Sequence, residues 1–262
     1  MIGGTAYDEK PGSVMVGGTV YTIKEGKVMV DGTAYSIKFE KGTPLSEYSV
    51  GSIVKLNVSG TAKEFIVVHQ GLPSSIYDDS CDGTWLLMKD IYENRVWDSS
   101  TNDYENSDIH AYLNGTFLGL FDSDIQSAIK QVKLPYRKGT GSGGSNVSGS
   151  SGLPAKIFLL SGYEVGWTTK DSSNFPVDGA CISYFSGIRE TDSKRIGYYE
   201  GTATRWFLRS PSTRSTGGSK IVWYVNYDGG HGFSGDCTSA RGVRPALVLP
   251  SSLLVSDDLL VV

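Results

Sequence analysis

The 262-residue sequence predicts an α+β protein in which most of the regular structure is antiparallel sheet. Short apolar or alternating stretches bounded by glycine recur along the chain, which is typical of strands joined by turns. Only two segments longer than one turn show helical periodicity. The 33 glycines follow no G-X-Y period, which excludes collagen, and aromatic residues at 11% supply enough apolar area to exclude a wholly disordered chain.

A repeat occupies the N-terminal segment. Residues 14–24 (VMVGGTVYTIK) recur as residues 28–38 (VMVDGTAYSIK), and residues 1–7 are a weaker copy. Each copy predicts two strands joined by a Gly-Gly or Asp-Gly turn, the dipeptides that tight hairpins favour. One hairpin is too small to bury a core, so we expect residues 1–42 to be a docking or oligomerisation segment that stacks on other parts or other subunits. A flexible leader is the alternative.

Residues 43–262 form the second predicted domain. The apolar run at residues 84–88 is typical of a central strand. Strands are expected at residues 52–58, 62–70, 84–88, 156–160, 205–211, 220–227 and 242–249.

Two helices are expected between these strands. Ser107 as N-cap and Gly115 as a stop signal predict the first over residues 107–115. An apolar stripe at i, i+3, i+4 and i+7 predicts the second over residues 122–132; its members are Ile125, Ala128, Ile129 and Val132. The Gly/Ser-rich residues 139–152 predict a flexible surface loop.

Charge and motif content exclude several functional classes. The net charge of −4 without a basic stripe excludes nucleic-acid binding by charge. No apolar run of 18 residues is present to insert into a membrane. The first residues lack the regions of a secretory signal, so synthesis in the cytoplasm is expected. The motifs of serine hydrolases, zinc proteases and P-loop enzymes are absent, so we expect no catalytic residue and no cofactor.

The metal-ligating residue types are few and scattered. Cys81, Cys181 and Cys237 are isolated and odd in number, which predicts buried free thiols in place of a disulfide framework or a zinc site. Carboxylates within residues 98–108 could offer oxygens to calcium, although their spacing does not match an EF-hand. We therefore expect no metal site.

Four segments, in this order, carry a resemblance: residues 107–117 (SDIHAYLNGTF), 157–165 (IFLLSGYEV), 205–211 (RWFLRSP) and 242–247 (GVRPAL). They resemble a bacterial and phage domain family with a C-type-lectin-like fold, and the likeness covers residues 45–250. His110 and Tyr112 depart from it, since that family commonly has Arg and Trp there.

The resemblance implies a C-type-lectin-like fold preceded by the hairpin repeats. It also implies a relation to variable tip and receptor-binding proteins, some of which are diversified by retroelements at adenines in Asn codons. Residues 224–237 contain no Lys, Glu, Gln, Met or Trp, the residues that such changes cannot produce. An ordinary glycine-rich loop is the alternative.

Residues 212–241 are the predicted binding surface. Their Tyr, Ser, Gly, Asn and Asp residues combine rigid aromatic area with adaptable hydrogen bonding, as antibody paratopes do. Alternate side chains over residues 223–228 face opposite sides of a strand, so we expect one set to pack inward and the other to meet a ligand. A solvated hairpin is the alternative. The candidate binding residues are Arg214, Tyr224, Asn226, Tyr227, Asp228, His231, Phe233, Ser234, Asp236 and Ser239.

The motif arginines Arg209 and Arg244 are expected to be structural. Each stands beside apolar strand residues, and an arginine in such a place more often binds carbonyl groups or a carboxylate of its own chain than a ligand.

These expectations combine into a non-enzymatic host-attachment protein on a phage tail or a bacterial cell surface, made in the bacterial cytoplasm. Its expected partners are a host cell-surface glycan or protein and, through residues 1–42, other tail or virion proteins. The related tip proteins imply a homotrimer. One alternative is a purely structural virion or surface protein. The other is a copper enzyme of the formylglycine-generating type, which shares the fold class and uses paired cysteines; Cys181 and Cys237 are the candidates.

Overall fold

The computed structural model describes residues 13–16, 19–22, 25–30, 33–38, 42–188, 191–215 and 218–262, with the backbone alone before residue 42. The chain divides into two compact units, residues 1–42 and 43–262. In the part of the chain so described, no helix has the length and apolar character needed to cross a membrane.

Two antiparallel hairpins make up the described part of the first unit. Strand β1 (Ser13–Val16) pairs with β2 (Thr19–Thr22), and β3 (Glu25–Val30) pairs with β4 (Thr33–Lys38). Met15 lies opposite Val20 in one hairpin, and Met29 lies opposite Ala34 in the other. The sequence repeat is therefore a structural repeat. Its weaker copy, residues 1–7, lies outside the described residues.

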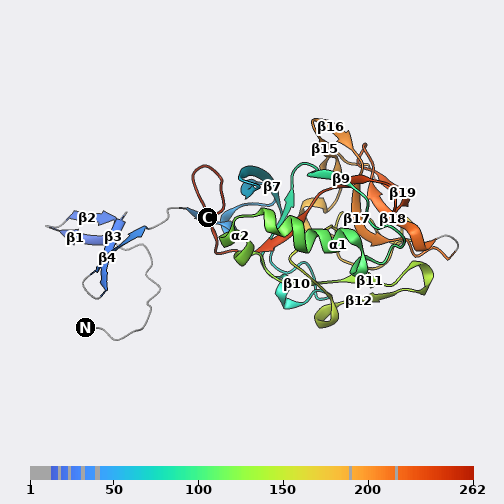
Figure 1. Ribbon diagram of the computed structural model, residues 1–262, viewed down its shortest axis with the longest axis horizontal. Helices are drawn as coiled ribbons and strands as arrows, with labels where there is room; N and C mark the ends of the chain where they lie inside the picture. Colours follow the sequence, from blue (N-terminus) through green and yellow to red (C-terminus); the bar gives the residue numbers. More distant parts are fainter. Residues whose placement is uncertain are drawn as a thin grey trace. The chain divides into compact units, whose positions relative to one another are not determined.

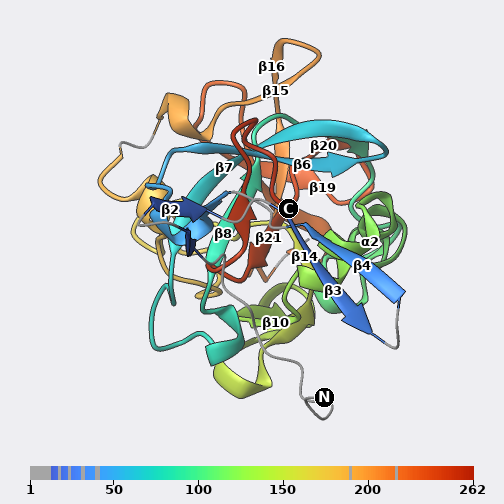
Figure 2. The same ribbon diagram turned by 90° about the vertical axis from the view of Figure 1, so that its left-hand side faces the viewer.

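The first of two five-stranded sheets in the second unit is antiparallel throughout, in the order β14-β21-β8-β7-β6. Strand β8 is central and buried along its whole length, as its apolar sequence predicts. Figure 2 shows β7, β8, β21 and β14 as neighbours in this order. The strands are β6 (Ile53–Val58), β7 (Thr61–Gln70), β8 (Thr84–Met88), β14 (Ile157–Phe158) and β21 (Ala246–Leu249).

The second sheet has the order β19-β18-β17-β20-β9. Its β17–β20 pair is parallel and its other pairs are antiparallel. Strands β17, β18 and β19 follow one another along the chain, and the predicted binding segment, residues 212–241, contains β18 and β19 (Figure 1). The strands are β9 (Glu93–Arg95), β17 (Trp206–Pro211), β18 (Ile221–Val225), β19 (His231–Asp236) and β20 (Arg241–Val243).

The chain passes from the second sheet to the first at Arg244 and Pro245. The prediction of one strand over residues 242–249 is therefore wrong: β20 and β21 belong to different sheets. Proline lacks the N–H that a sheet ladder needs, so it separates the two strands. The buried Arg244 guanidinium donates from Nε to the Met88 carbonyl at 2.9 Å and from Nη2 to the Lys89 carbonyl at 2.9 Å. Arg244 is thus structural, as predicted.

Four short antiparallel pairs complete the strands that the structure describes in this unit: β5 (Thr43–Pro44) with β22 (Leu254–Val255), β10 (Val132–Leu134) with β13 (Leu153–Ala155), β11 (Tyr136–Lys138) with β12 (Ser145–Val147), and β15 (Gly197–Tyr199) with β16 (Thr202–Thr204).

Residues 139–152 are more regular than the expected flexible loop. They contain β12 and two 3-10 turns, and Arg137 Nη2 donates to the Gly141 carbonyl at 3.0 Å. A Cβ at Gly144 would lie 2.7 Å from the Lys138 carbonyl oxygen. Glycine at this position serves close backbone packing, a use that composition does not distinguish from flexibility.

Helix α1 (Asp108–Tyr112) begins where predicted, because Ser107 Oγ accepts from the His110 N–H at 3.2 Å. The helical path does not stop at Gly115 as predicted, because Gly115 has no positive φ to make a left-handed cap. After α1 the chain continues through a π turn and a 3-10 turn to Leu120. Helix α2 (Ser123–Ala128) is shorter than predicted because β10 begins at Val132. Figure 1 shows the two helices in succession across one face of this unit.

Apolar residues fill both sides of the sheets. The helix-side core, which contains Ile109, Phe117 and Ile125 from the helical segments, also receives Leu86 and Met88 from β8. The loop-side core receives the alternate residues Trp85 and Leu87. It is completed by residues of the long segment after β14, such as Val165, Trp167, Phe175, Ile182 and Phe185. All five tryptophans of the chain are buried.

Asn114 ties the helical segment to strand β14, and we expect Asn114→Ala to destabilise the protein. Its Oδ1 accepts from the Lys156 N–H at 2.7 Å and its Nδ2 donates to the Ile157 carbonyl at 2.9 Å. Alanine leaves these backbone groups without partners, so the free energy of unfolding should fall by about 2–3 kcal/mol in urea titration. Asn94→Ala, at an exposed position of β9, should change it by less than about 0.5 kcal/mol. Equal losses would contradict this role.

Candidate functional site

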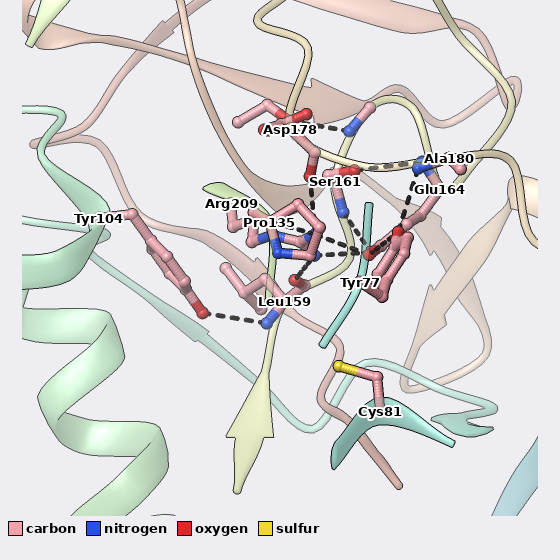
Figure 3. Close-up of polar contacts among 12 residues, drawn as sticks. Tyr77, Cys81, Tyr104, Pro135, Leu159, Ser161, Glu164, Asp178, Ala180 and Arg209 are labelled. Carbon is pink, nitrogen blue, oxygen red and sulfur yellow. Dashed lines mark hydrogen bonds and ion pairs between the residues drawn. The ribbon is translucent and has the colours of Figure 1, made fainter. Parts of the chain in front are cut away.

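A buried polar cluster surrounds Arg209 on β17 (Figure 3). The guanidinium forms a bidentate pair with Glu164, with both N···O distances at 2.6 Å. It also donates to the Leu159, Pro135 and Asp178 carbonyls at 2.9–3.1 Å. Burial alone would lower the pKa of Arg209, and the Glu164 carboxylate outweighs it and raises that pKa. Arg209 is therefore held by its own chain, as predicted.

Glu164 is fixed by a reciprocal pair of hydrogen bonds with Ser161. The Ser161 N–H donates to Glu164 Oε2 at 2.9 Å, and the Glu164 N–H donates to Ser161 Oγ at 3.1 Å. This is a capping box on a single turn, which does not continue into a helix. Tyr77 donates its hydroxyl proton to Glu164 Oε1 at 2.8 Å. The carboxylate is thus saturated by protein donors and has no access to a ligand.

Asp178 is the acid of this cluster that keeps an unpaired oxygen within the described part of the chain. Its Oδ2 accepts from Ser210 Oγ at 2.6 Å, while its buried Oδ1 has no hydrogen-bond partner there. Burial raises the pKa of Asp178 to about 7 although the Arg209 charge acts to lower it. The charged groups of this cluster are enclosed, and they support the loop-side core.

The carboxylates considered for calcium bind protein donors instead. Asp98 Oδ1 accepts from the Ser100 and Thr101 N–H groups at 2.8 Å, and Asp98 Oδ2 accepts from the Asp108 N–H at 3.1 Å. Glu105 accepts from the Tyr136 hydroxyl at 3.1 Å. Across the described ranges, no group of three His, Cys, Asp or Glu side chains could hold a metal ion.

The three thiols are free, and they lie apart. Cys237 is buried in the helix-side core, whereas the exposed Cys181 lies beside Gly166 and Arg195, next to the loop-side core. Burial raises the pKa of Cys81 and of Cys237 to about 11, which disfavours the thiolate that binds metals. Cys181 is not buried, contrary to expectation. Cys181 and Cys237, the candidates for the paired cysteines of a copper enzyme, therefore lie in different surroundings and form no pair.

The predicted binding residues separate to the two ends of the β18–β19 hairpin. Ile221 pairs with Asp236 at the open end, and Val225 pairs with His231 beside the connecting turn. Three members of the set lie at or near the open end and are exposed: Arg214, Asp236 and Ser239. Three others lie in the turn, where Asn226 is half-buried and Tyr227 and Asp228 are exposed. The side chains of Phe233 and Ser234 lie outside the described residues.

Tyr224 does not face a ligand, and its inclusion among the contact residues is wrong. The residue is 6% exposed and its ring lies in the helix-side core. A Cβ at Gly232 would lie 2.0 Å from the ring, and a Cβ at Gly235 would lie 2.8 Å from it, so these glycines make room for it. The expectation that one face of β18 meets a ligand is wrong for the same reason: both sides of the sheet carry a core, and Trp223 and Val225 are also buried.

Two more predicted residues, His231 and Asp236, make packing contacts or hydrogen bonds within the protein. His231 packs edge-on against Trp167, Phe175 and Trp223, with ring centroids 5.6–5.9 Å apart. Asp236 Oδ1 accepts from the N–H and the hydroxyl of Thr238, both at 2.9 Å, and these bonds lower the pKa of Asp236. The packed His231 is therefore a poor candidate for ligand contact, whereas ligand contact by the exposed Asp236 stays a prediction.

The turn that carries Tyr227 is held firmly. The Asn226 N–H donates to the Gly230 carbonyl at 2.7 Å, and Asp228 Oδ1 accepts from the Gly230 N–H at 3.0 Å. At Gly229 φ is +81°, and a Cβ there would lie 2.1 Å from the Asp192 carbonyl oxygen. Only glycine allows this close approach. The turn thus presents Tyr227, 54% exposed, from a fixed backbone.

One residue beside this turn was missed by the sequence analysis. The exposed Arg205 donates from Nε to Asn226 Oδ1 at 2.8 Å, and its guanidinium lies 5.6 Å from the centre of the Tyr227 ring. Its position as the first residue of the motif at residues 205–211 gave no sign of this surface role. We call Arg205, Asn226, Tyr227 and Asp228 the Tyr227 rim.

Glu164→Gln should destabilise the protein far more than Glu64→Gln. Glutamine leaves the Arg209 charge buried without compensation, so the free energy of unfolding should fall by about 3–5 kcal/mol. Glu64 forms an exposed ion pair with Lys89, and its substitution should cost about 0–1 kcal/mol. Urea titration of both variants measures the contrast. Similar losses would show that the buried pair has no special structural role.

Asp178 should make stability depend on pH. Because its folded pKa of about 7 exceeds the value near 3.9 of an unfolded chain, its contribution is complete below about pH 4 and is lost as the pH rises through 7. Asp178→Asn removes this loss. Relative to the native protein, its free energy of unfolding should rise by about 1.4 kcal/mol per pH unit between pH 4 and 7. Asp79→Asn, at an exposed position, should run parallel to the native curve. A parallel curve for Asp178→Asn would contradict the prediction.

Comparison with known proteins gives a family and no described function. No curated protein and no solved structure matches the chain. Residues 82–251 match a family described as a domain of unknown function, DUF6273. The matched range runs from just before β8 to just after β21 and includes Arg209, Arg244 and the Tyr227 rim. Since it spans more than half of the sequence, the chain belongs to the DUF6273 family.

Proposed function

We propose that this protein is a non-enzymatic binding protein that attaches a phage tail or a bacterial surface to a host cell through the Tyr227 rim. The observation that carries the proposal is Tyr227 itself. Among the large hydrophobic side chains of the described residues it is the most exposed, at 54%. An aromatic ring held outward on a rigid turn is a typical binding anchor, because little conformational entropy is lost when it is covered.

The polar groups around Tyr227 suit recognition more than catalysis. Asn226, Asp228 and Arg205 offer an amide, a carboxylate and a guanidinium within one turn and its neighbouring strand end. The buried Arg209 and Glu164, by contrast, are already paired with each other. A surface of this kind can choose a partner by hydrogen bonds while Tyr227 supplies contact area.

The proposed fold and assembly follow from the family resemblance. We assign the second unit to the C-type-lectin-like class, which agrees with its mainly antiparallel sheets and few short helices. The hairpins of residues 1–42 would join the protein to other tail or virion proteins, and three copies would raise avidity for a host surface. Diversification by a retroelement would be supported by a reverse transcriptase gene beside an adenine-rich copy of the 3′ coding end.

Tyr227→Ala should weaken attachment about tenfold or more, as truncation of a central aromatic anchor does. The measurement is binding of the full chain, fluorescently labelled, to a glycan array and to a panel of bacterial cells. Tyr198→Ala is the matched control, since Tyr198 is 43% exposed on the β15–β16 hairpin. Equal binding by the Tyr227→Ala variant to every positive cell or glycan would reject the proposed surface.

A further inference from the structure

A row of arginines crosses the second sheet beside the Tyr227 rim. Arg241 on β20 lies directly opposite Arg95 on β9, so the two side chains start from the same face. On the other side of β20, the Gly242 N–H donates to the Arg205 carbonyl at 2.9 Å, which places Arg205 next to Arg241. The guanidinium carbons of Arg205 and Arg241 lie 5.8 and 4.3 Å from the centre of the same ring, that of Tyr224.

Like charges on neighbouring strands repel each other, and the structure neutralises only one end of the row. Arg95 pairs with Glu93 at 3.0 Å and stacks on Tyr112 at 3.7 Å. Neither Arg205 nor Arg241 has an acidic group within 4.0 Å in the parts of the chain that the structure describes. Both sit against aromatic rings, which hold a guanidinium without cancelling its charge.

The Nε of Arg241 in particular lacks an acceptor, because it is buried and has no hydrogen-bond partner among the described residues. Burial lowers the pKa of Arg241, and although Tyr224 acts to raise it, the charge of Arg205 lowers it further. The charge of Asp236 also acts to raise the pKa of Arg241, but its effect is smaller than that of Arg205. The Oδ1 of Asp236 accepts a hydrogen bond from the Thr238 N–H. Two neighbouring guanidinium groups therefore share a region in which an external oxyanion would relieve their repulsion.

The surroundings of Arg205 indicate what carries that oxyanion. Guanidinium forks match carboxylate and phosphate groups with paired hydrogen bonds. The exposed Tyr227 ring, 5.6 Å from Arg205, offers the flat aromatic face on which the C–H groups of a sugar ring pack. Asn226 and Asp228 add groups suited to hydroxyls. An acidic saccharide combines all of these features.

We propose that Arg205 and Arg241 bind the carboxylate or phosphate group of an acidic saccharide whose ring packs on Tyr227. This inference rests on the proposed function and names the ligand class of the same rim. It also limits the partner, since a neutral saccharide would leave both arginines without a counter-charge.

The test is calorimetric titration of the full chain with trigalacturonic acid, glucose phosphate and neutral maltotriose. We expect one or both acidic probes to bind at least tenfold more tightly than maltotriose, and to lose affinity as salt rises. The two acidic probes separate carboxylate from phosphate recognition. Arg205→Gln and Arg241→Gln should each raise Kd about tenfold or more.

Lys63→Gln is the matched control, because it removes the same charge from an exposed position of β7. Its Kd should equal that of the native protein. Arg241 contributes packing to Tyr224, so the exposed Arg205 variant keeps the test valid if Arg241→Gln unfolds.

Several results would overturn the inference. These are equal affinity for maltotriose, no binding of either acidic probe at millimolar concentration, or an Arg205→Gln variant that behaves like Lys63→Gln. Equally tight binding of hexaglutamate would show that the arginines bind acidic peptides as well as they bind acidic saccharides, which would contradict the proposed ligand class. If Tyr227→Ala abolishes cell attachment while both arginine variants attach normally, the inference fails and the proposed function stands. If Tyr227→Ala leaves attachment unchanged, the proposed function fails.

Discussion

The second unit depends on the enclosed pair of Arg209 and Glu164, because this pair joins segments that no strand ladder connects. Between β14 and β15 the chain has little regular structure, yet it must cover the loop-side core. The guanidinium supplies the missing backbone partners by binding carbonyl groups at positions 135, 159 and 178. An apolar side chain could fill the same volume, but it would leave those carbonyls without donors.

A second buried arginine, Arg195, holds the turn that we assign to binding. Arg195 is 1% exposed, stacks on Trp167 at 4.5 Å and donates from Nε to the Val165 carbonyl at 2.7 Å. Its Nη1 reaches the Gly229 carbonyl at 3.4 Å, inside the turn that carries Tyr227. A buried arginine thus connects the loop-side core to an exposed ring. A contact surface built in this way is ordered before any partner arrives, which lowers the entropic cost of association.

Local signals in the sequence predicted the parts of the fold that local chemistry decides. The N-cap at Ser107, the apolar run of β8 and the paired hairpins of the first unit are of this kind. Features set by contacts distant in sequence were missed. Tyr224 alternates with buried neighbours and still packs inward, because both sides of its sheet are covered. Arg205 lies next to Arg241 because β17 and β20 pair in parallel, and no local pattern in the sequence reveals this pairing.

The burial of every tryptophan has a practical consequence for spectroscopy. Four indole rings, those of Trp85, Trp167, Trp206 and Trp223, belong to the loop-side core, and Trp97 alone belongs to the helix-side core. Intrinsic fluorescence therefore reports mainly on solvent entry into one half of the protein. Loosening of the helices would change the emission of Trp97 alone, so a second optical probe is needed to follow the helix-side core.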